Sequence, residues 1–260
     1  MNHTPFKKER VKRGIYVLPN LFTTASLFCG FYSVIASMKG AYSLAALPIL
    51  IAFVLDGLDG RIARMTNTTS KFGSEYDSLS DLVAFGVAPA ILVYSWALSS
   101  YGKWGWLTAF IYVVCGALRL ARFNVQIGMI ESKVFNGLPI PGAAAVIATG
   151  VMFFYYLGGE GRFDDLSILI SVVGLSLLMI SNIKYYSFKD LNFFSRKPFM
   201  SFVLIVFILI IITAEPQIMM FTFAFGYSLS GPCWTIIILL KRTYGEIKEK
   251  RSQTEKHSLL

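Results

Sequence analysis

Apolar stretches long enough to cross a lipid bilayer recur along the whole of this 260-residue chain. A membrane-spanning helix needs about 20 predominantly apolar residues. Charged residues make up only 15% of the chain, whereas soluble domains usually carry roughly 25%. The sequence therefore predicts an all-α, polytopic membrane helix bundle of about eight transmembrane helices. We expect the spans at residues 18–38, 42–64, 72–99, 104–122, 138–157, 166–182, 200–214 and 216–240.

The basic residues are distributed unevenly between the two sides of such a bundle. If the N-terminus is cytoplasmic, all of the 24 Lys and Arg except Lys39, Lys103 and Arg162 fall in cytoplasmic segments. Cytoplasmic loops of membrane proteins carry this excess of positive charge. The pattern predicts an integral protein of the cell (inner) membrane with both termini in the cytoplasm. We expect the net charge of +9 to attract anionic lipid rather than nucleic acid.

The same pattern divides the chain into three parts. We expect a basic cytoplasmic segment over residues 1–17, a transmembrane domain over 18–240, and a basic, disordered cytoplasmic tail over 241–260.

Histidine and cysteine chemistry is not indicated. The two histidines, His3 and His257, lie in the terminal segments, and the three cysteines form no CxxC pair. The cysteines are therefore interpreted as small apolar fillers. Any general base in the membrane region must then be a carboxylate, a lysine or a tyrosine.

Four aspartates stand out in the apolar sequence: Asp56, Asp59, Asp77 and Asp81. Spacings of three and four residues place each pair on one face of its helix. A six-residue turn over 65–70 brings both pairs to one level, just below the cytoplasmic headgroups. Carboxylates this close repel one another unless a positive charge lies between them, and oxygen ligands suit Mg²⁺, Mn²⁺ or Ca²⁺. The sequence therefore predicts a metal site at headgroup depth.

Two alternatives to a catalytic metal site would also explain the four aspartates. They could form interhelical ion pairs with Arg61 and Arg64, but two arginines do not neutralise four carboxylates and Glu75. They could also belong to a metal-coupled transporter. Transporter sites lie near the bilayer midplane and recur in internal repeats, and the later spans contain no second acidic cluster.

The spacing of these residues resembles the signature of the CDP-alcohol phosphatidyltransferases. That pattern, D-x-x-D-G-x-x-A-R followed after eight residues by G-x-x-x-D-x-x-x-D, matches at every fixed position from Asp56 to Asp81. The segments 18–23 (LPNLFT), 115–125 (CGALRLARFNV) and 137–141 (GLPIP) resemble the membrane-type, serine-using branch of this family.

The resemblance implies transfer of the phosphatidyl group of CDP-diacylglycerol to L-serine, with release of CMP. It implies two divalent cations, Mg²⁺ or Mn²⁺, with Ca²⁺ as a non-productive alternative, held by Asp56, Asp59, Asp77 and Asp81. Asp81 would also be the catalytic base, which agrees with the absence of a histidine from the predicted transmembrane domain. The resemblance suggests a homodimer. The acceptor stays open between serine and glycerol phosphate, inositol phosphate or choline.

Further residues are candidates for substrate binding. At Gly60, Ala63 and Gly73 a larger side chain would intrude on the nucleotide or a neighbouring helix. Arg64 can donate a forked pair of hydrogen bonds to a phosphate. The complete set expected to bind CDP-diacylglycerol is Asn20, Thr23, Asp56, Gly60, Ala63, Arg64 and Gly73.

Three residues near the end of the fourth span are candidates for binding serine. Arg119 and Arg122 are three residues apart, and a pair of arginines would recognise the serine carboxylate, although anchoring at the cytoplasmic surface explains them equally well. Asn124 is a weaker candidate beside them.

Overall fold

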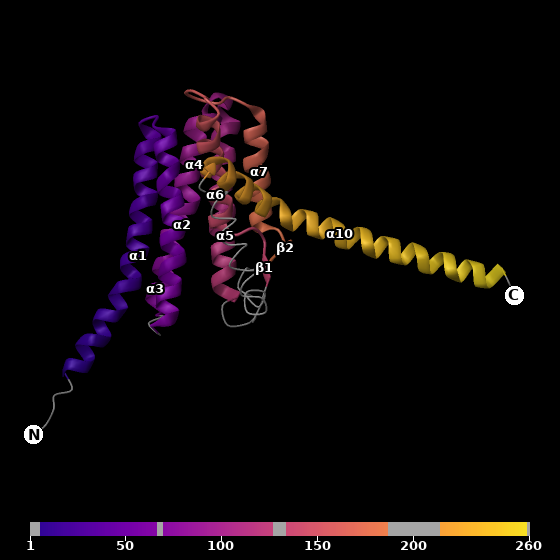
Figure 1. The fold of residues 1–260 in the computed structure, drawn as a ribbon, viewed down its shortest axis with the longest axis horizontal. Helices are drawn as coiled ribbons and strands as arrows, with labels where there is room; N and C mark the ends of the chain where they lie inside the picture. The colour runs from indigo at the N-terminus through magenta and orange to yellow at the C-terminus, as the bar shows by residue number, and fades with distance from the viewer. Residues whose placement is uncertain (1–5, 67–69, 127–133, 187–213, 259–260) are drawn as a thin grey trace, which may run out of the picture.

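The computed structural model describes residues 6–66, 70–126, 134–186 and 214–258. Most of these residues form a bundle of roughly parallel and antiparallel helices (Figure 1). The α-helices are α1 (Phe6–Met38), α2 (Tyr42–Met65), α3 (Lys71–Asp81), α4 (Ala88–Val93), α5 (Lys103–Gln126), α6 (Ile140–Tyr156), α7 (Leu166–Ile180) and α10 (Pro216–Ser258).

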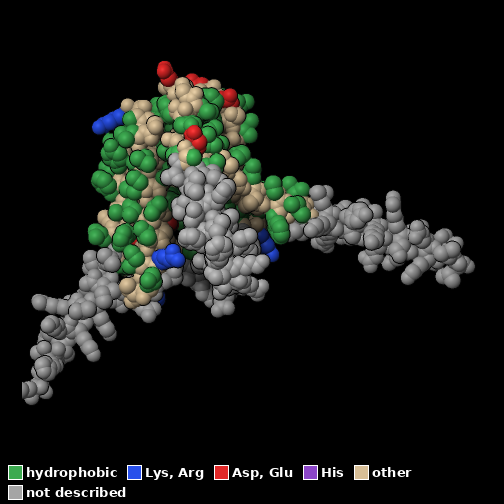
Figure 2. All heavy atoms as spheres, viewed as in Figure 1, with side chains coloured by type: hydrophobic (Ala, Val, Ile, Leu, Met, Phe, Trp, Pro, Cys, Tyr) green, Lys and Arg blue, Asp and Glu red, His purple; other side chains and the backbone are tan. Residues whose placement is uncertain are grey.

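The membrane character of the chain is confirmed, whereas the number of spans is not. Within the described residues, four helical stretches are long and apolar enough to cross a bilayer: Pro19–Met38, Tyr42–Ile62, Lys71–Tyr101 and Lys103–Gln126. Helices α6 and α7 are apolar but shorter. The predicted span at 200–214 lies almost wholly outside the described residues. Figure 2 shows hydrophobic side chains covering the visible flank of the bundle, with acidic side chains gathered at the end remote from α3.

Both ends of the predicted transmembrane domain differ from the expectation. Helix α1 starts at Phe6 and passes through residue 17 without a break, and α10 continues from Pro216 to Ser258. The prediction of a disordered tail over 241–260 is therefore wrong for most of that segment. Its lysines, glutamates and glutamine have high helix propensity, so the helix extends beyond the apolar stretch.

The predicted span at 72–99 is helical throughout but not a single α-helix. The π-helix η1 (Leu82–Val87) separates α3 from α4, and a second π-helix, η2 (Tyr94–Leu98), follows α4 and leads into the 3₁₀ turn η3 (Ser99–Tyr101). Pro89 has no amide hydrogen for the carbonyl of Phe85, its usual partner four residues earlier. The Tyr112 hydroxyl, fully buried on α5, donates to that carbonyl instead (3.1 Å). Tyr112 thus gives the Phe85 carbonyl a hydrogen bond that Pro89 cannot supply.

Small residues bring α1, α2 and α3–η1 close together. Ala45 and Ala52 on α2 are fully buried, and Ser33 on α1 donates to the Ala45 carbonyl (2.7 Å). A Cβ at Gly30 would lie 2.6 Å from the Cα of Ala84 in η1. Close backbone approach through small residues is the usual way that membrane helices pack, and here it fixes α3–η1 against α1.

A short antiparallel ribbon connects the remaining helices, which the all-α prediction did not include. Strand β1 (Val134–Asn136) pairs with β2 (Lys184–Tyr186). Gly137 follows with φ of 81°, and a Cβ there would lie 2.3 Å from the Met179 carbonyl oxygen. Only glycine tolerates that combination, so the ribbon holds the start of α6 against the end of α7.

Helix α10 packs antiparallel to α6 before it leaves the bundle (Figure 1). The Phe221 ring stacks on Phe153 near the end of α6, with centroids 5.0 Å apart. Further along α10, Tyr227 lies against Gly142 near the start of α6. Two contacts in reverse order along the two helices establish the antiparallel arrangement.

Candidate active site

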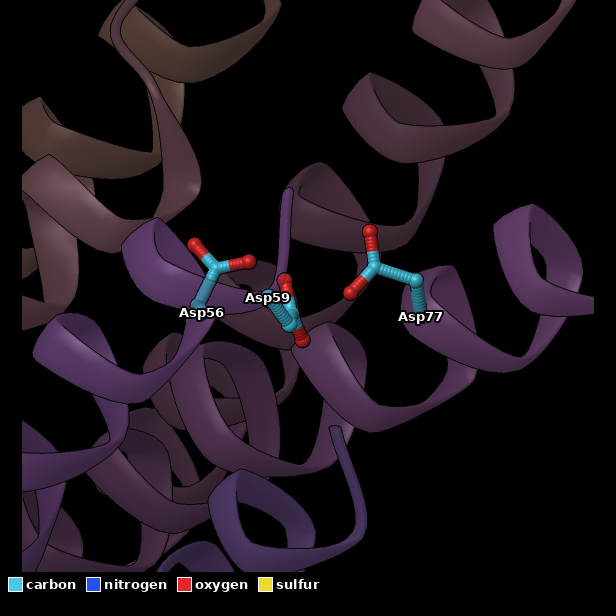
Figure 3. Close-up of side chains that lie close together, drawn as sticks. All are labelled: Asp56, Asp59 and Asp77. Atoms are coloured by element: carbon cyan, nitrogen blue, oxygen red, sulfur yellow. The ribbon is translucent and has the colours of Figure 1, made fainter. Parts of the chain in front are cut away.

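Three of the four predicted aspartates meet where α2 and α3 lie side by side. Carboxylate oxygens of Asp56, Asp59 and Asp77 all lie within 4.8 Å of one another, and Figure 3 shows these side chains converging from the two helices. The side chain of Asp59 is buried, with only 4% exposed. Three carboxylates at this separation in an apolar protein repel one another, and a divalent cation between them would relieve that repulsion. An all-oxygen donor set fits Mg²⁺ or Mn²⁺.

Helix α1 orients the central carboxylate. The Thr23 hydroxyl donates to Asp59 Oδ2 (2.8 Å) and also lies 3.1 Å from the Pro19 carbonyl oxygen. Ser80, buried on α3, donates to the Thr23 carbonyl (3.0 Å). Thr23, predicted to bind nucleotide, therefore bonds a candidate metal ligand, and through Ser80 it links the helices that carry Asp59 and Asp77.

Asp81 lies beside this group rather than within it. It is the last residue of α3, where the helix gives way to η1. It interacts electrostatically with the other three aspartates and with Arg119 on α5. Asp81 thus lies within electrostatic range of both the carboxylate cluster and the arginine, and a hydroxyl group reacting beside it would find both a base and a positive charge.

Gly73 lies in the first turn of α3, close to Asn20 of α1. The Gly73 amide donates to the Ser70 hydroxyl, which caps α3. A Cβ on Gly73 would lie 3.1 Å from that hydroxyl oxygen and 3.5 Å from Asn20 Oδ1. The lack of a side chain at Gly73 lets the first turn of α3, one turn before Asp77, lie close to Asn20 of α1.

The other predicted donor-binding residues are placed less fully. Gly60 is on α2, one residue after Asp59, and is partly buried. Ala63 and Arg64 belong to the last turns of α2, and their side chains lie outside the described part of the structure.

The three predicted serine-binding residues do not share one environment. Arg119 interacts electrostatically with Asp81, and its Nε is buried without a hydrogen-bond partner among the described residues. Arg122 donates to Asn182 Oδ1 (2.6 Å), in the connection from α7 to β2. The Asn124 amide nitrogen donates to Ser78 on α3 (2.9 Å). Among the three, only Arg119 combines an electrostatic interaction with Asp81 and a buried side-chain nitrogen that has no partner among the described residues.

Several residues that shape the site escaped the sequence analysis. Gly30 and Tyr112 hold η1 directly after Asp81, while Ser78 and Ser80 join α3 to α5 and α1. Serine and glycine are common in membrane helices, so nothing in the sequence marks these four. Pro89 was the one available signal, since a proline inside a span removes a backbone hydrogen bond.

Comparisons with known proteins agree with this geometry. A CDP-diacylglycerol–serine O-phosphatidyltransferase of Helicobacter pylori (strain J99) is 36% identical over 237 residues, covering 90% of this chain and 97% of the relative. An enzyme of the same name from Bacillus subtilis is 37% identical over 174 residues, covering 66% and 91%. The archaetidylserine synthase of Methanothermobacter thermautotrophicus is 41% identical over 170 residues, covering 65% and 69%.

The matching family model covers the part of the chain that contains the whole carboxylate cluster. It describes the CDP-alcohol phosphatidyltransferases and spans residues 16–181, from α1 to the end of α7. The four aspartates on α2 and α3, Thr23 on α1 and Arg119 on α5 all lie within it. On the carboxylate geometry and these matches together, the chain belongs to the CDP-alcohol phosphatidyltransferase family.

Proposed function

We propose that this protein transfers the phosphatidyl group of CDP-diacylglycerol to L-serine, producing phosphatidylserine and CMP. The observation that carries the proposal is the close approach of Asp56, Asp59 and Asp77 in a chain of this family. The serine acceptor is supported by the names of the Helicobacter pylori and Bacillus subtilis relatives.

Two divalent cations, Mg²⁺ or Mn²⁺, would be held by Asp56, Asp59, Asp77 and Asp81. When bound, they would polarise the diphosphate and neutralise the charge that develops on the leaving CMP. Asn20, Thr23, Gly60, Ala63, Arg64 and Gly73 would bind the nucleotide and diphosphate, while the acyl chains stay in lipid. The Thr23 hydroxyl has a second task in this proposal, because its hydrogen bond to Asp59 (2.8 Å) fixes the direction of that carboxylate.

Asp81 would act as the general base. The serine hydroxyl oxygen forms a bond to the phosphorus that carries diacylglycerol, and the bond from that phosphorus to the CMP oxygen breaks. The hydroxyl proton passes to Asp81, because a neutral hydroxyl is a poor nucleophile. Asp81 is outside the group of three close carboxylates and interacts electrostatically with Arg119, which supports this division of roles.

Arg119 would bind the serine carboxylate, with Arg122 and Asn124 supporting the same end of the site. A planar guanidinium can form two parallel hydrogen bonds with a carboxylate. The unpartnered Nε of Arg119 supports its assignment to a substrate group, since buried arginine donors are normally satisfied. Glycerol phosphate, inositol phosphate and choline lack this carboxylate.

The test is an acceptor panel with the purified protein. Protein in detergent micelles containing CDP-diacylglycerol and Mn²⁺ or Mg²⁺ is given serine, glycerol phosphate, inositol phosphate or choline, and CMP and lipid product are measured. Release of CMP with serine alone supports the proposal. Release with another acceptor keeps the chemistry and replaces the substrate. If no acceptor releases CMP while the cation crosses protein-containing liposomes, a metal-coupled transporter is the better description.

The membrane arrangement is part of the proposal. We place the aspartates at the cytoplasmic face of the inner membrane, with both termini cytoplasmic, because the basic residues favour that side. We also propose a homodimer, on family resemblance. Labelling of single cysteines introduced at Ser70 and Gly158 in intact cells tests the topology, and light scattering of the detergent-solubilised protein tests the dimer.

A further inference from the structure

Helix α10 lies outside the region matched by the family model, yet a fully buried tyrosine attaches it to the β1–β2 ribbon. Tyr185 of β2 has no exposed surface, and its hydroxyl donates to the Ser228 carbonyl of α10 (2.9 Å). A Cβ on Gly231, one turn further along α10, would lie 2.5 Å from the Tyr185 ring. Glycine at 231 thus lets the helix lie directly on the ring.

This attachment determines where Tyr227 points. Tyr227 precedes Ser228, and its ring lies 5.7 Å from that of Tyr185, centroid to centroid. On its other side, Tyr227 is in van der Waals range of the position that a Cβ on Gly142 would occupy (3.4 Å). The Tyr227 side chain therefore packs between the Tyr185 ring and Gly142 of α6, which restricts its rotation.

In this position Tyr227 interacts electrostatically with Arg119 on α5. Arg119 also interacts electrostatically with Asp81, so the aspartates, the arginine and Tyr227 form an electrostatic series that ends on α10. The second arginine of α5 joins the same assembly, because Arg122 bonds Asn182 (2.6 Å) just before β2, which carries Tyr185. Both arginines of α5 are thereby connected to α10, Arg119 through Tyr227 and Arg122 through the β2 ribbon.

We propose that Tyr227 is a positioning residue of the acceptor site, which holds the Arg119 guanidinium toward Asp81 and so sets the affinity for the acceptor. This inference rests on the proposed function, and it assigns a role in the site to a helix beyond the family domain. The phenol oxygen of Tyr227 can accept a hydrogen bond from a guanidinium, which would leave the remaining donors of Arg119 for the acceptor. Holding Arg119 in one orientation reduces the entropy that is lost when the acceptor carboxylate binds.

The experiment measures both substrate constants of the purified full-length protein, using CMP release with serine and CDP-diacylglycerol varied separately. Tyr227→Phe keeps the ring and its packing and removes only the hydroxyl. We expect the KM for serine to rise about five- to tenfold, with the KM for CDP-diacylglycerol and the thermal stability close to those of the wild type. Tyr185→Phe should shift the serine KM in the same direction, because it releases Ser228 beside Tyr227.

The matched control is Tyr156→Phe. The Tyr156 hydroxyl donates to Glu215, the residue directly before α10, so this variant also removes one tyrosine hydroxyl and keeps the ring. Tyr156 lies at the opposite end of α6 from Gly142, so its loss should leave both KM values unchanged. A serine KM within twofold of the wild type in Tyr227→Phe would overturn the inference, as would an equal rise in both KM values. If the wild-type protein releases CMP only with a different acceptor, the proposed function is wrong instead, and this result is obtained before any variant is made.

Discussion

The two sides of the candidate site are built in different ways. On the side of α1, α2 and α3, the carboxylates and the residues that orient them lie within residues 19–81, on neighbouring helices. On the side of Arg119, the groups come from α5, the β2 ribbon and α10, and Tyr227 is more than 100 residues distant from Arg119 in the chain. The first side follows from helical spacing, and the second requires three segments to fold onto one another.

This difference has a physical consequence for substitutions. A change on the carboxylate side removes charge or geometry needed for the reaction, so it should act on turnover and on the metal. A change on the Arg119 side alters how an acceptor is held, so it should act on one KM. The following predictions separate the two sides, from the largest expected effect to the smallest.

The largest effect is expected for Asp77→Asn. Loss of one anionic ligand from the group of three should lower CMP release by about a thousandfold or more, since metal and electrostatic stabilisation carry most of this reaction. Treatment with EDTA should abolish activity of the wild type, and Mn²⁺ or Mg²⁺ should restore it. Asp164→Asn, an aspartate that bonds Ser100 away from the site, is the control. Wild-type turnover in Asp77→Asn would remove the metal assignment.

A smaller loss is expected for Gly30→Ala. The added methyl group meets the Cα of Ala84 at 2.6 Å, so α1 and η1 must separate or shift. Overpacking of this kind costs about 1–3 kcal/mol, and because η1 begins directly after Asp81, turnover should fall about tenfold along with thermal stability. Gly174→Ala is the control, because a Cβ there meets no heavy atom within 4 Å. If the two variants behave alike, close packing at Gly30 does not position Asp81.

Thr23→Val decides between two roles for one hydroxyl. If its main partner is Asp59, the concentration of Mn²⁺ needed for half-maximal activity should rise about tenfold, as is typical when a group that orients a metal ligand is lost. Thr23→Ser should restore the wild-type value. A rise in the KM for CDP-diacylglycerol with an unchanged Mn²⁺ requirement would instead assign the hydroxyl to the nucleotide.

The smallest effect is expected for Arg122→Gln. Its guanidinium already bonds Asn182, so the serine KM should change by no more than about threefold, while stability falls by about 1 kcal/mol. Arg119→Gln should raise the serine KM by more than tenfold, because a charged, bidentate contact is lost. Equal increases in the two variants would show that both arginines contact the acceptor.

Helical spacing and hydropathy predicted most of the first side of the site. The pairs at 56/59 and 77/81 share helix faces because the helix has 3.6 residues per turn, and a short turn brings α2 and α3 together. The resemblance to the CDP-alcohol phosphatidyltransferases, now confirmed, rested on those same residues. The helices at 42–64, 104–122, 138–157 and 166–182 were likewise predicted to within a few residues, since long apolar runs in a membrane protein leave the backbone no alternative to a helix.

What could not be predicted depends on contacts between distant segments. No local pattern announces that Arg122 bonds Asn182, that Tyr185 bonds Ser228, or that residues 134–136 pair with 184–186. The continuation of α10 through the charged tail and the interruption of the third span by π-helices also went unpredicted. The ribbon and these hydrogen bonds depend on partners elsewhere in the chain, whereas the continuation of α10 follows from the helix propensity of its own residues.

The π-helix after Asp81 has one further consequence. Each residue of an α-helix turns the chain by about 100°, and a π-helical turn accommodates one additional residue. An α-helical turn in place of the π-helix at Leu82–Val87, with the same number of residues, would therefore turn Asp77 and Asp81 by about that angle relative to α4, and so away from α2. The chemical identity of every carboxylate would be unchanged. In this protein the helical phase of one span, as much as the choice of side chains, brings Asp77 to Asp56 and Asp59.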